Sequence, residues 1–169
     1  LSPQPRSGSC VRSFKRRCPV LNIGDKAPAF AAEDQYGKTI RLADLKGKTV
    51  VLYFYPKDLT PGCTIEARAF EKGLAAIKKK GAVVLGVSKD GVASHKKFAD
   101  KHGLSFSLLA DEDLGLIKAY GAWGERSLYG RKFMGTLRIT YVIGPKGTVR
   151  AAFPKVKPAE HAAEVLAAI

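Results

Sequence analysis

The 169-residue chain carries 29 Lys and Arg residues against 15 Asp and Glu, a formal net charge of +14, and 46% of its residues are hydrophobic. This length fits one domain, and no apolar run reaches the roughly 18 residues needed to cross a bilayer, so we expect no membrane segment. Three cysteines are too few for a disulfide scaffold, and no His lies near a Cys in sequence, so we expect no zinc site.

The first 24 residues differ in composition from the rest of the chain. They include five basic residues, no acidic residue and several Ser and Pro. This composition is typical of an organelle transit peptide or its remnant, and a disordered basic arm without targeting function is the alternative. We therefore predict a basic tail over residues 1–24 and a globular domain over residues 25–169.

The domain begins with strand signals followed by a long helix. Residues 28–48 have the pattern of a hairpin that turns at Tyr36 and Gly37, and "TVVLYFYP" (49–56) reads as a buried strand. From about Thr64 to Lys80, apolar residues recur at helical spacing, and Gly81 then closes the predicted helix. The apolar stripe of this helix consists of Ala67, Phe70, Leu74 and Ile77.

The remaining segments alternate between strand and helix patterns. We predict strands, helices and one loop in this order: strand 82–88, helix 91–103, strand 105–111, helix 113–121, loop 122–135, strands 137–144 and 147–154, and helix 158–169. The last two strands should pair as an antiparallel hairpin across a Pro-Lys turn. This order predicts an α/β fold with a mixed central sheet between helices on both faces, which gives three layers.

Cys63 follows Thr-Pro-Gly where the long helix is expected to begin. A thiol with the ordinary pKa of about 8.5 is mostly protonated at neutral pH, so a nucleophilic cysteine needs stabilisation of its thiolate. The start of a helix supplies unpaired N–H groups and the positive end of the helix dipole. Thr60 can direct a hydroxyl into the same pocket, and Arg138, on an otherwise apolar strand, is a candidate cation. A buried, unreactive cysteine is the alternative.

Two separate segments resemble one known family. "YFYPKDLTPGCTIEARAF" (53–70) is similar to the active-site segment of peroxiredoxins, in particular the peroxiredoxin Q or bacterioferritin comigratory protein subgroup. "YGAWGERSLYGRKFMG" (120–135), followed by an Arg in the next predicted strand, resembles the same subgroup. The similarity extends from about Ile23 to the C-terminus, and it implies a thioredoxin-like fold.

The resemblance also implies roles for five residues. Cys63 would be the peroxidatic cysteine, which attacks the O–O bond of a hydroperoxide and becomes a sulfenic acid. Thr60 would hydrogen-bond the peroxide, and Arg138 would stabilise the thiolate and the developing charge. Pro56 would shield the pocket, and Glu66 would orient the arginine. The redox chemistry belongs to sulfur, so the resemblance implies no metal or organic cofactor.

The chain departs from the family at the resolving cysteine. Many members carry a second cysteine five residues after the first, and here that position is Arg68. The next predicted helix, where other members place it, also lacks a cysteine. We therefore expect a one-cysteine mechanism, in which thioredoxin, glutaredoxin or glutathione reduces the sulfenic acid. The alternatives are resolution by Cys10 or Cys18 of the tail, or pairing of two Cys63 thiols.

Four further residues attract attention without a clear chemical role. Trp123 and Tyr129 either cover the active-site pocket or pack on the sheet as loop aromatics. His95 and His102 lie seven residues apart on one predicted helix face, and no ligand cluster accompanies them. We expect these two histidines to be surface residues.

The sequence thus predicts a thiol-dependent peroxidase that reduces hydrogen peroxide and organic hydroperoxides. The alternatives are a peroxide sensor in redox signalling, and a nucleic-acid-associated protective protein whose basic surface makes weak phosphate contacts. We expect a monomer that does not bind membranes. For location, the composition of the tail and the resemblance favour a plastid, with the mitochondrion, nucleus and cytoplasm as alternatives.

Overall fold

The computed structural model describes residues 20–169. Its core is a five-stranded sheet in the order β5-β4-β3-β8-β9, in which β3, β4 and β5 are parallel, β8 is antiparallel to β3, and β9 is antiparallel to β8. The strands are β3 (Thr49–Phe54), β4 (Ala82–Ser88), β5 (Ser107–Ala110), β8 (Thr140–Ile143) and β9 (Val149–Phe153). The predicted mixed sheet is confirmed.

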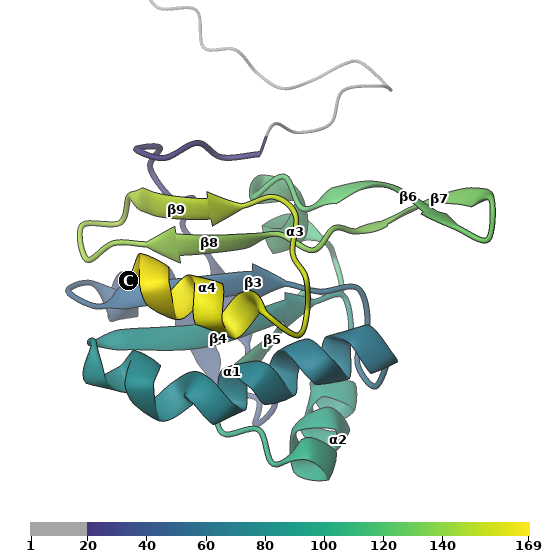
Figure 1. Ribbon diagram of the computed structural model, residues 1–169, viewed down its shortest axis with the longest axis horizontal. Helices are drawn as coiled ribbons and strands as arrows, with labels where there is room; N and C mark the ends of the chain where they lie inside the picture. The colour runs from purple at the N-terminus through teal and green to yellow at the C-terminus, as the bar shows by residue number, and fades with distance from the viewer. Residues whose placement is uncertain (1–19) are drawn as a thin grey trace, which may run out of the picture.

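Helices cover both faces of this sheet (Figure 1). The helices are α1 (Pro61–Lys79), α2 (Val92–His102), α3 (Gly115–Ala119) and α4 (His161–Ala168), and η1 (Leu42–Leu45) is a short 3-10 helix. Different helices contribute to the hydrophobic cores on the two faces of the sheet. Side chains of α1 and α4 fill one core, together with Phe98 of α2, whereas side chains of α3 pack with η1 and the N-terminal hairpin in the other.

Two small hairpins lie outside the central sheet. The first joins β1 (Ala31–Glu33) to β2 (Thr39–Arg41), and its turn contains Gly37 at a φ of +75°, as expected for the predicted hairpin. The second joins β6 (Trp123–Leu128) to β7 (Arg131–Thr136) and projects from the body of the molecule (Figure 1). The prediction of a loop over residues 122–135 is therefore wrong.

The β3–α1–β4 unit places the candidate site. All six residues of β3 are buried, because the sheet is covered on both faces. The chain leaves the carboxyl end of β3, passes through a loop over residues 55–60 and enters α1. The predicted apolar stripe of α1 is buried: Ala67, Phe70, Leu74 and Ile77. Burial of this stripe against the sheet holds the first turn of α1 at the end of β3.

Within the described residues, no helix has the length and apolar character needed to cross a membrane. The predicted tail over residues 1–24 lies mostly outside the described part of the chain, and so do Cys10 and Cys18. The predicted boundary at residue 25 stays a prediction. Described residues begin at Val20, and Gly24 already hydrogen-bonds to the carbonyl of Val149.

Candidate active site

Cys63 lies in the first turn of α1. The helix begins at Pro61, three residues before the predicted start, and Thr60 precedes it in an extended conformation as the N-cap. Cys63 is therefore inside the turn whose backbone N–H groups have no partner within the helix. The residue is only 1% exposed. The positive end of the helix dipole favours the thiolate form at this position.

Arg138 contacts the sulfur directly. Its Nη2 donates a hydrogen bond of 3.1 Å to Cys63 Sγ, and its Nη1 donates one of 2.8 Å to Glu66 Oε2. The planar guanidinium can make both contacts at once. Arg138 lies two residues before β8, whereas the sequence predicted it within the strand. Its positive charge beside the sulfur stabilises the thiolate electrostatically.

Glu66 is buried beneath the arginine. Its side chain is 1% exposed, and its Oε1 has no hydrogen-bond partner among the described residues. Burial raises the pKa of Glu66 to about 7, although the charge of Arg138 and its hydrogen bond act in the opposite direction. Both protonation states of this carboxyl group are therefore populated near neutral pH.

Gly62 makes room for the arginine. A β-carbon at this position would lie 2.8 Å from Arg138 Nη2. Gly62 lies within α1 and has no positive φ, so the backbone conformation does not require a glycine here. The absence of its side chain matters instead, because it lets the guanidinium reach the sulfur of Cys63.

Thr60 and Pro56 come from the loop between β3 and α1. Both are half-buried. The hydroxyl of Thr60 donates a hydrogen bond of 2.8 Å to the carbonyl of Lys57. Because the hydroxyl proton is used in this way, the Thr60 oxygen is left as an acceptor next to the first turn of α1.

A second arginine, Arg126, was missed by the sequence reasoning. Burial lowers its pKa, the charge of Arg138 lowers it further, and the charge of Cys63 raises it. Arg126 is therefore close enough for its charge to interact with both residues. Its guanidinium lies 5.9 Å from the centre of the Phe133 ring on the neighbouring strand β7. Its place in the "YGAWGERSLYGRKFMG" segment, which carries part of the family resemblance, was the available signal.

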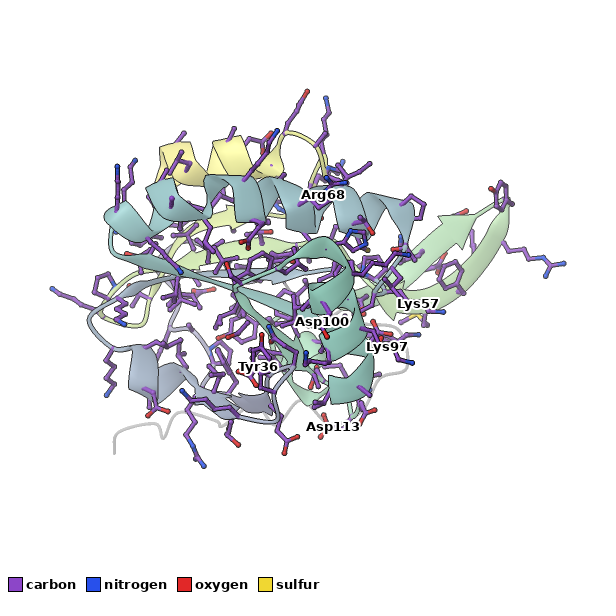
Figure 2. The ribbon with its side chains drawn as sticks, turned by 90° about the horizontal axis from the view of Figure 1, so that it is seen from below. Tyr36, Lys57, Arg68, Lys97, Asp100 and Asp113 are labelled. Carbon is purple, nitrogen blue, oxygen red and sulfur yellow. The ribbon has the colours of Figure 1, made fainter. Side chains whose placement is uncertain are left out.

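Arg68 is exposed on α1 (Figure 2), at the position where the resemblance described above implies a resolving cysteine in many family members. The described residues contain a single cysteine, the buried Cys63. The same residues hold no group of three or more His, Cys, Asp or Glu side chains arranged for a metal ion. Thiol chemistry within the described domain therefore depends on Cys63 alone.

The aromatic and histidine predictions had mixed outcomes. Trp123 is half-buried against the core on the α3 face, whereas Tyr129, at the turn of the β6–β7 hairpin, is 97% exposed. His102 is half-buried and lies edge-on to Phe98. His95 is fully buried, so the prediction of a surface position is wrong for this residue.

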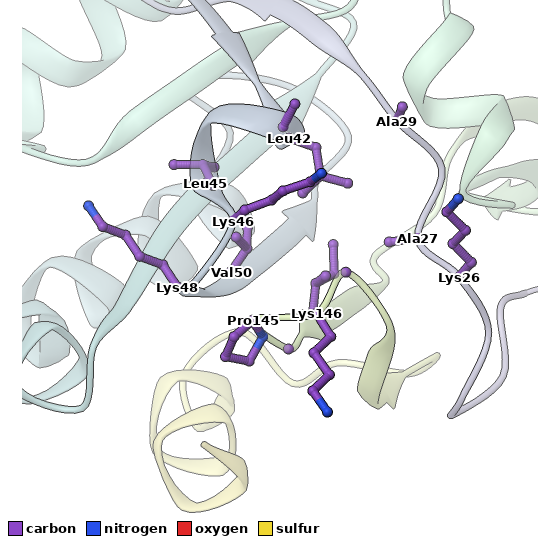
Figure 3. A pocket seen from close by; sticks show the side chains of 14 residues that line it. Lys26, Ala27, Ala29, Leu42, Leu45, Lys46, Lys48, Val50, Pro145 and Lys146 are labelled. Carbon is purple, nitrogen blue, oxygen red and sulfur yellow. The ribbon is translucent and has the colours of Figure 1, made fainter.

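A pocket of about 410 Å³ lies at the other end of β3 from Cys63 (Figure 3). It is lined by residues at the start of β3, the end of β8, and the segments before and within η1. Its lining includes four lysines and none of the candidate catalytic residues: Lys26, Lys46, Lys48 and Lys146. This pocket is therefore separate from the Cys63 site.

Comparison with known proteins identifies the family. The AhpC/TSA family matches residues 23–152. The chain belongs to this family. It is 44% identical over 146 residues to a putative peroxiredoxin Bcp of Coxiella burnetii, covering 86% of this chain and 97% of that protein. It is 42% identical over 147 residues to peroxiredoxin Bcp of Bacillus subtilis, covering 87% of this chain and 94% of that protein.

Solved structures of the same type share the fold. The bacterioferritin comigratory protein of Xanthomonas campestris superposes with a TM-score of 0.78 at 41% identity, over 82% of this chain and 88% of that one. A cysteine mutant of PrxQ from Xylella fastidiosa superposes with a TM-score of 0.84 at 37% identity, over 88% of this chain and 95% of that one. The predicted thioredoxin-like peroxiredoxin fold is confirmed. The protein is a peroxiredoxin, and therefore a thiol-dependent peroxidase.

Proposed function

We propose that this peroxiredoxin works by a one-cysteine mechanism, with Cys63 as the peroxidatic residue. The observation that carries the proposal is the 3.1 Å hydrogen bond from Arg138 to the Cys63 sulfur at the start of α1. A guanidinium and a helix N-terminus both stabilise negative charge on the same atom. The described domain offers no second thiol with which Cys63 could form a disulfide.

In the first half-reaction, the thiolate of Cys63 attacks the terminal oxygen of a hydroperoxide. The S–O bond forms as the O–O bond breaks, and the sulfur becomes a sulfenic acid. The other oxygen leaves as hydroxide or alkoxide and takes a proton from solvent, which gives water or an alcohol. Negative charge spreads from sulfur to the oxygens in the transition state, so the fixed guanidinium of Arg138 lowers the barrier.

Three neighbouring residues support this step. Thr60 accepts a hydrogen bond from the hydroperoxide O–H, because its own proton is held by the Lys57 carbonyl. Glu66 fixes the orientation of Arg138 through their 2.8 Å contact. Pro56, half-buried at the end of β3, restricts access of water to the pocket.

In the second half-reaction, an external thiol attacks the sulfenic sulfur and releases water, which leaves a mixed disulfide on Cys63. A second thiol then restores the Cys63 thiol and leaves as the oxidised reductant. Peroxiredoxins of this family use thiol reductants, and we propose thioredoxin, glutaredoxin or glutathione here. Pairing of two Cys63 residues is disfavoured because the sulfur is buried at 1% exposure.

The substrates proposed are hydrogen peroxide and organic hydroperoxides. The related protein of Xanthomonas campestris was described for its alkyl peroxide reduction activity. We also propose a monomer and, from the basic tail, a plastid location. A redox-sensing role remains the alternative, since a domain without a second cysteine retains the sulfenic acid until a partner thiol arrives.

Weak nucleic-acid contact is a second candidate property, and the lysines around the pocket of Figure 3 favour it. Such contact would involve phosphates only and would decrease steeply with salt. A gel-shift titration in about 150 mM salt tests it, and absence of a shifted band at that salt concentration removes this candidate.

A steady-state assay with thioredoxin, glutaredoxin and glutathione in parallel tests the mechanism. We expect Cys63→Ser to abolish peroxide consumption, and the double variant Cys10→Ser with Cys18→Ser to retain most of it. Mass spectrometry of the oxidised wild type should show a sulfenic acid or a mixed disulfide on Cys63. If the double variant were inactive with every reductant, the tail would contain the resolving thiol and the one-cysteine proposal would be wrong.

A further inference from the structure

A buried polar cluster lies behind the loop that joins β3 to α1. Asp58 is 4% exposed in this cluster, and His95 of α2 is fully buried. The carboxylate of Asp58 accepts hydrogen bonds from the hydroxyls of Tyr55 (2.6 Å) and Ser94 (2.8 Å). His95 Nδ1 lies 2.7 Å from Asp58 Oδ2. Side chains from the end of β3 and from α2 thus converge on one loop carboxylate.

The hydrogen-bond partners determine where the protons lie. His95 Nε2 is 2.9 Å from the carbonyl oxygen of Leu109, which can only accept, so Nε2 carries a proton. Both oxygens of Asp58 accept hydrogen bonds from hydroxyls, and Oδ2 shares a further hydrogen bond with His95 Nδ1. Every side-chain nitrogen and oxygen of the pair therefore has a hydrogen-bond partner, as buried polar groups require.

The backbone of Asp58 is held as well as its side chain. Its N–H donates a hydrogen bond of 2.9 Å to Asp90 Oδ2, and the hydroxyl of Ser88, at the end of β4, donates one of 2.7 Å to the same oxygen. The loop is therefore attached to β4 as well as to α2. These two attachments fix the position of Asp58, which immediately precedes the strained residue Leu59.

Leu59 has a φ of +62°, in the left-handed region that a branched side chain rarely adopts. Such a conformation persists only where the surrounding structure imposes it. Leu59 lies between the anchored Asp58 and Thr60, the N-cap of α1. The direction in which the chain enters α1, and so the position of the Thr60 oxygen relative to Cys63, depends on this restrained turn.

We propose that Asp58 and His95 form a positioning pair for the peroxidase reaction. The pair holds the loop so that Thr60 stays in place for the hydroperoxide while the thiolate of Cys63 attacks. Neither residue touches the sulfur. The proposal rests on the role proposed for Thr60, and its test separates the two.

The pair does not act as a general acid or base. The far nitrogen of His95 is occupied by the Leu109 carbonyl, and the ring is fully buried, so no substrate reaches it. The near nitrogen faces only Asp58 and the Tyr55 hydroxyl, at 3.3 Å. The Asp58–His95 pair therefore affects the reaction through the geometry of the loop.

A double-mutant cycle between Asp58 and Thr60 tests the proposal. The variants are Asp58→Asn, Thr60→Val and the double variant, and the measurement is the single-turnover rate constant of the reduced protein with hydrogen peroxide. We expect Asp58→Asn to lower this rate constant at least about tenfold, because misplacement remote from the chemistry has effects of this size. The double variant should match Thr60→Val within about twofold, because both changes remove the same contribution.

A second readout is the rate of Cys63 alkylation by iodoacetamide. Alkylation needs the thiolate, which Arg138 stabilises from a different segment, but it does not need Thr60. We therefore expect Asp58→Asn to change it by less than about threefold. His95→Asn keeps an N–H in the place of Nδ1, and His95→Gln keeps one in the place of Nε2. His95→Asn should retain more peroxide reactivity than His95→Gln, because only His95→Asn preserves a donor toward Asp58.

The matched control is Asp100→Asn, on the exposed face of α2 (Figure 2). Asp100 also forms an ion pair, with Lys96 at 2.6 Å, but this pair faces solvent. This variant should react with peroxide as the wild type does. Equal losses in peroxide and alkylation rates of Asp58→Asn would overturn the proposal, and so would independent, multiplying effects of Asp58→Asn and Thr60→Val.

A third variant covers the case in which Asp58→Asn does not fold. Tyr55→Phe deletes the hydroxyl that donates to Asp58 and lies 3.3 Å from His95 Nδ1, and it leaves the 2.7 Å contact between Asp58 and His95 in place. In the same cycle with Thr60→Val, it should lower the peroxide rate constant by about threefold or more, without an additional effect in the double variant. Unchanged peroxide reactivity of Tyr55→Phe would then overturn the proposal. If Thr60→Val alone leaves the rate constant unchanged, the role proposed for Thr60 is wrong, and the proposal that the pair acts through Thr60 fails with it. If Thr60→Val is slow but its effect multiplies with that of Tyr55→Phe or Asp58→Asn, only the positioning proposal fails.

Discussion

Gly62 and Arg138 are complementary: the guanidinium occupies the space that a side chain at Gly62 would fill, with Nη2 only 2.8 Å from the position of such a β-carbon. Gly62→Ala should therefore displace the guanidinium from the Cys63 sulfur. The displaced atom is the end of a flexible side chain, so folding should be little affected. We expect the rate constant with hydrogen peroxide to fall by about 10- to 100-fold. This is less than the roughly 100- to 1000-fold loss on removal of a transition-state donor, because the guanidinium is displaced and not deleted.

The matched control for this change is Gly73→Ala, in the same helix. A β-carbon at Gly73 meets nothing within 4 Å. This variant should keep full peroxidase activity and gain about 0.5–1 kcal/mol of stability, because alanine restricts the unfolded chain and favours the helix. Rates from stopped-flow kinetics and melting temperatures of both variants make the comparison. Equal activity of the two variants would show that the contact between Arg138 and Cys63 is dispensable.

Arg138→Lys should separate charge from geometry. A lysine keeps the positive charge but cannot reproduce the planar two-nitrogen contact with Glu66 and Cys63. We expect a loss of about 100-fold in the rate constant with hydrogen peroxide. Arg126→Lys is the comparison, because its charge acts from further away and should tolerate the exchange. Near-normal rates in Arg138→Lys would mean that charge alone is sufficient.

Glu66 should make stability depend on pH. Its pKa is raised from 4.5 to about 7 in the folded protein, mainly by burial, so between these values the folded state binds more protons than the unfolded state. The stability that this proton uptake contributes is fully present below pH 4.5 and is lost as pH rises through 7. The loss is on the order of 3 kcal/mol.

Glu66→Gln removes this titration while keeping an oxygen near Arg138. Urea unfolding at several pH values between 4.5 and 8 should show that the wild type loses stability relative to the variant as pH rises. The readout is the change with pH in the difference between the two free energies of unfolding. The other titrating groups are common to both proteins, so their effects cancel in this difference. A constant difference across the range would contradict the raised pKa of Glu66.

Arg68→Cys introduces the second thiol that the described domain lacks. In an intact helix, residues five apart have their α-carbons roughly 8–9 Å apart, which is beyond the reach of a disulfide. We expect peroxide to produce a Cys63–residue 68 disulfide only as the first turns of α1 unwind. Mass spectrometry should find the loss of two hydrogens, and circular dichroism should find less helix.

The control for this experiment is Ala69→Cys, one residue further along and on a different side of the helix. It should give little intramolecular disulfide under the same conditions. If Arg68→Cys remained a sulfenic or sulfinic acid, α1 would be too rigid to bring the two sulfurs together, and reduction would stay dependent on an external thiol.

The β6–β7 hairpin shows why part of the fold could not be predicted. Residues 131–134 of β7 are exposed in succession, so the segment has no alternation of buried and exposed residues to indicate a strand. The one available signal was the Tyr129–Gly130 turn, where both residues have positive φ. The central strands were predictable because burial on both faces leaves continuous apolar runs.

His95 shows why the polar cluster around Asp58 could not be predicted from the sequence. It lies three and four residues before Phe98 and Ala99, which are buried on the same face of α2. That spacing is compatible with burial, yet we expected a surface position, because a histidine is buried in this way only when its two nitrogens find partners. Those partners, Asp58 and the Leu109 carbonyl, come from two other segments. Periodicity within one helix could not supply them.

The amino-acid sequence was sufficient to predict the order of the main elements, the apolar stripe of α1, and the place of Cys63 at the start of that helix. These are local properties, set by spacing and by residue type. The partners that surround the sulfur depend instead on the three-dimensional packing. Arg138 is 75 residues away in the chain, and it reaches Cys63 because β8 pairs with β3 and Gly62 leaves the space open. Contacts of this kind depend on the packing of distant segments, which no local pattern specifies.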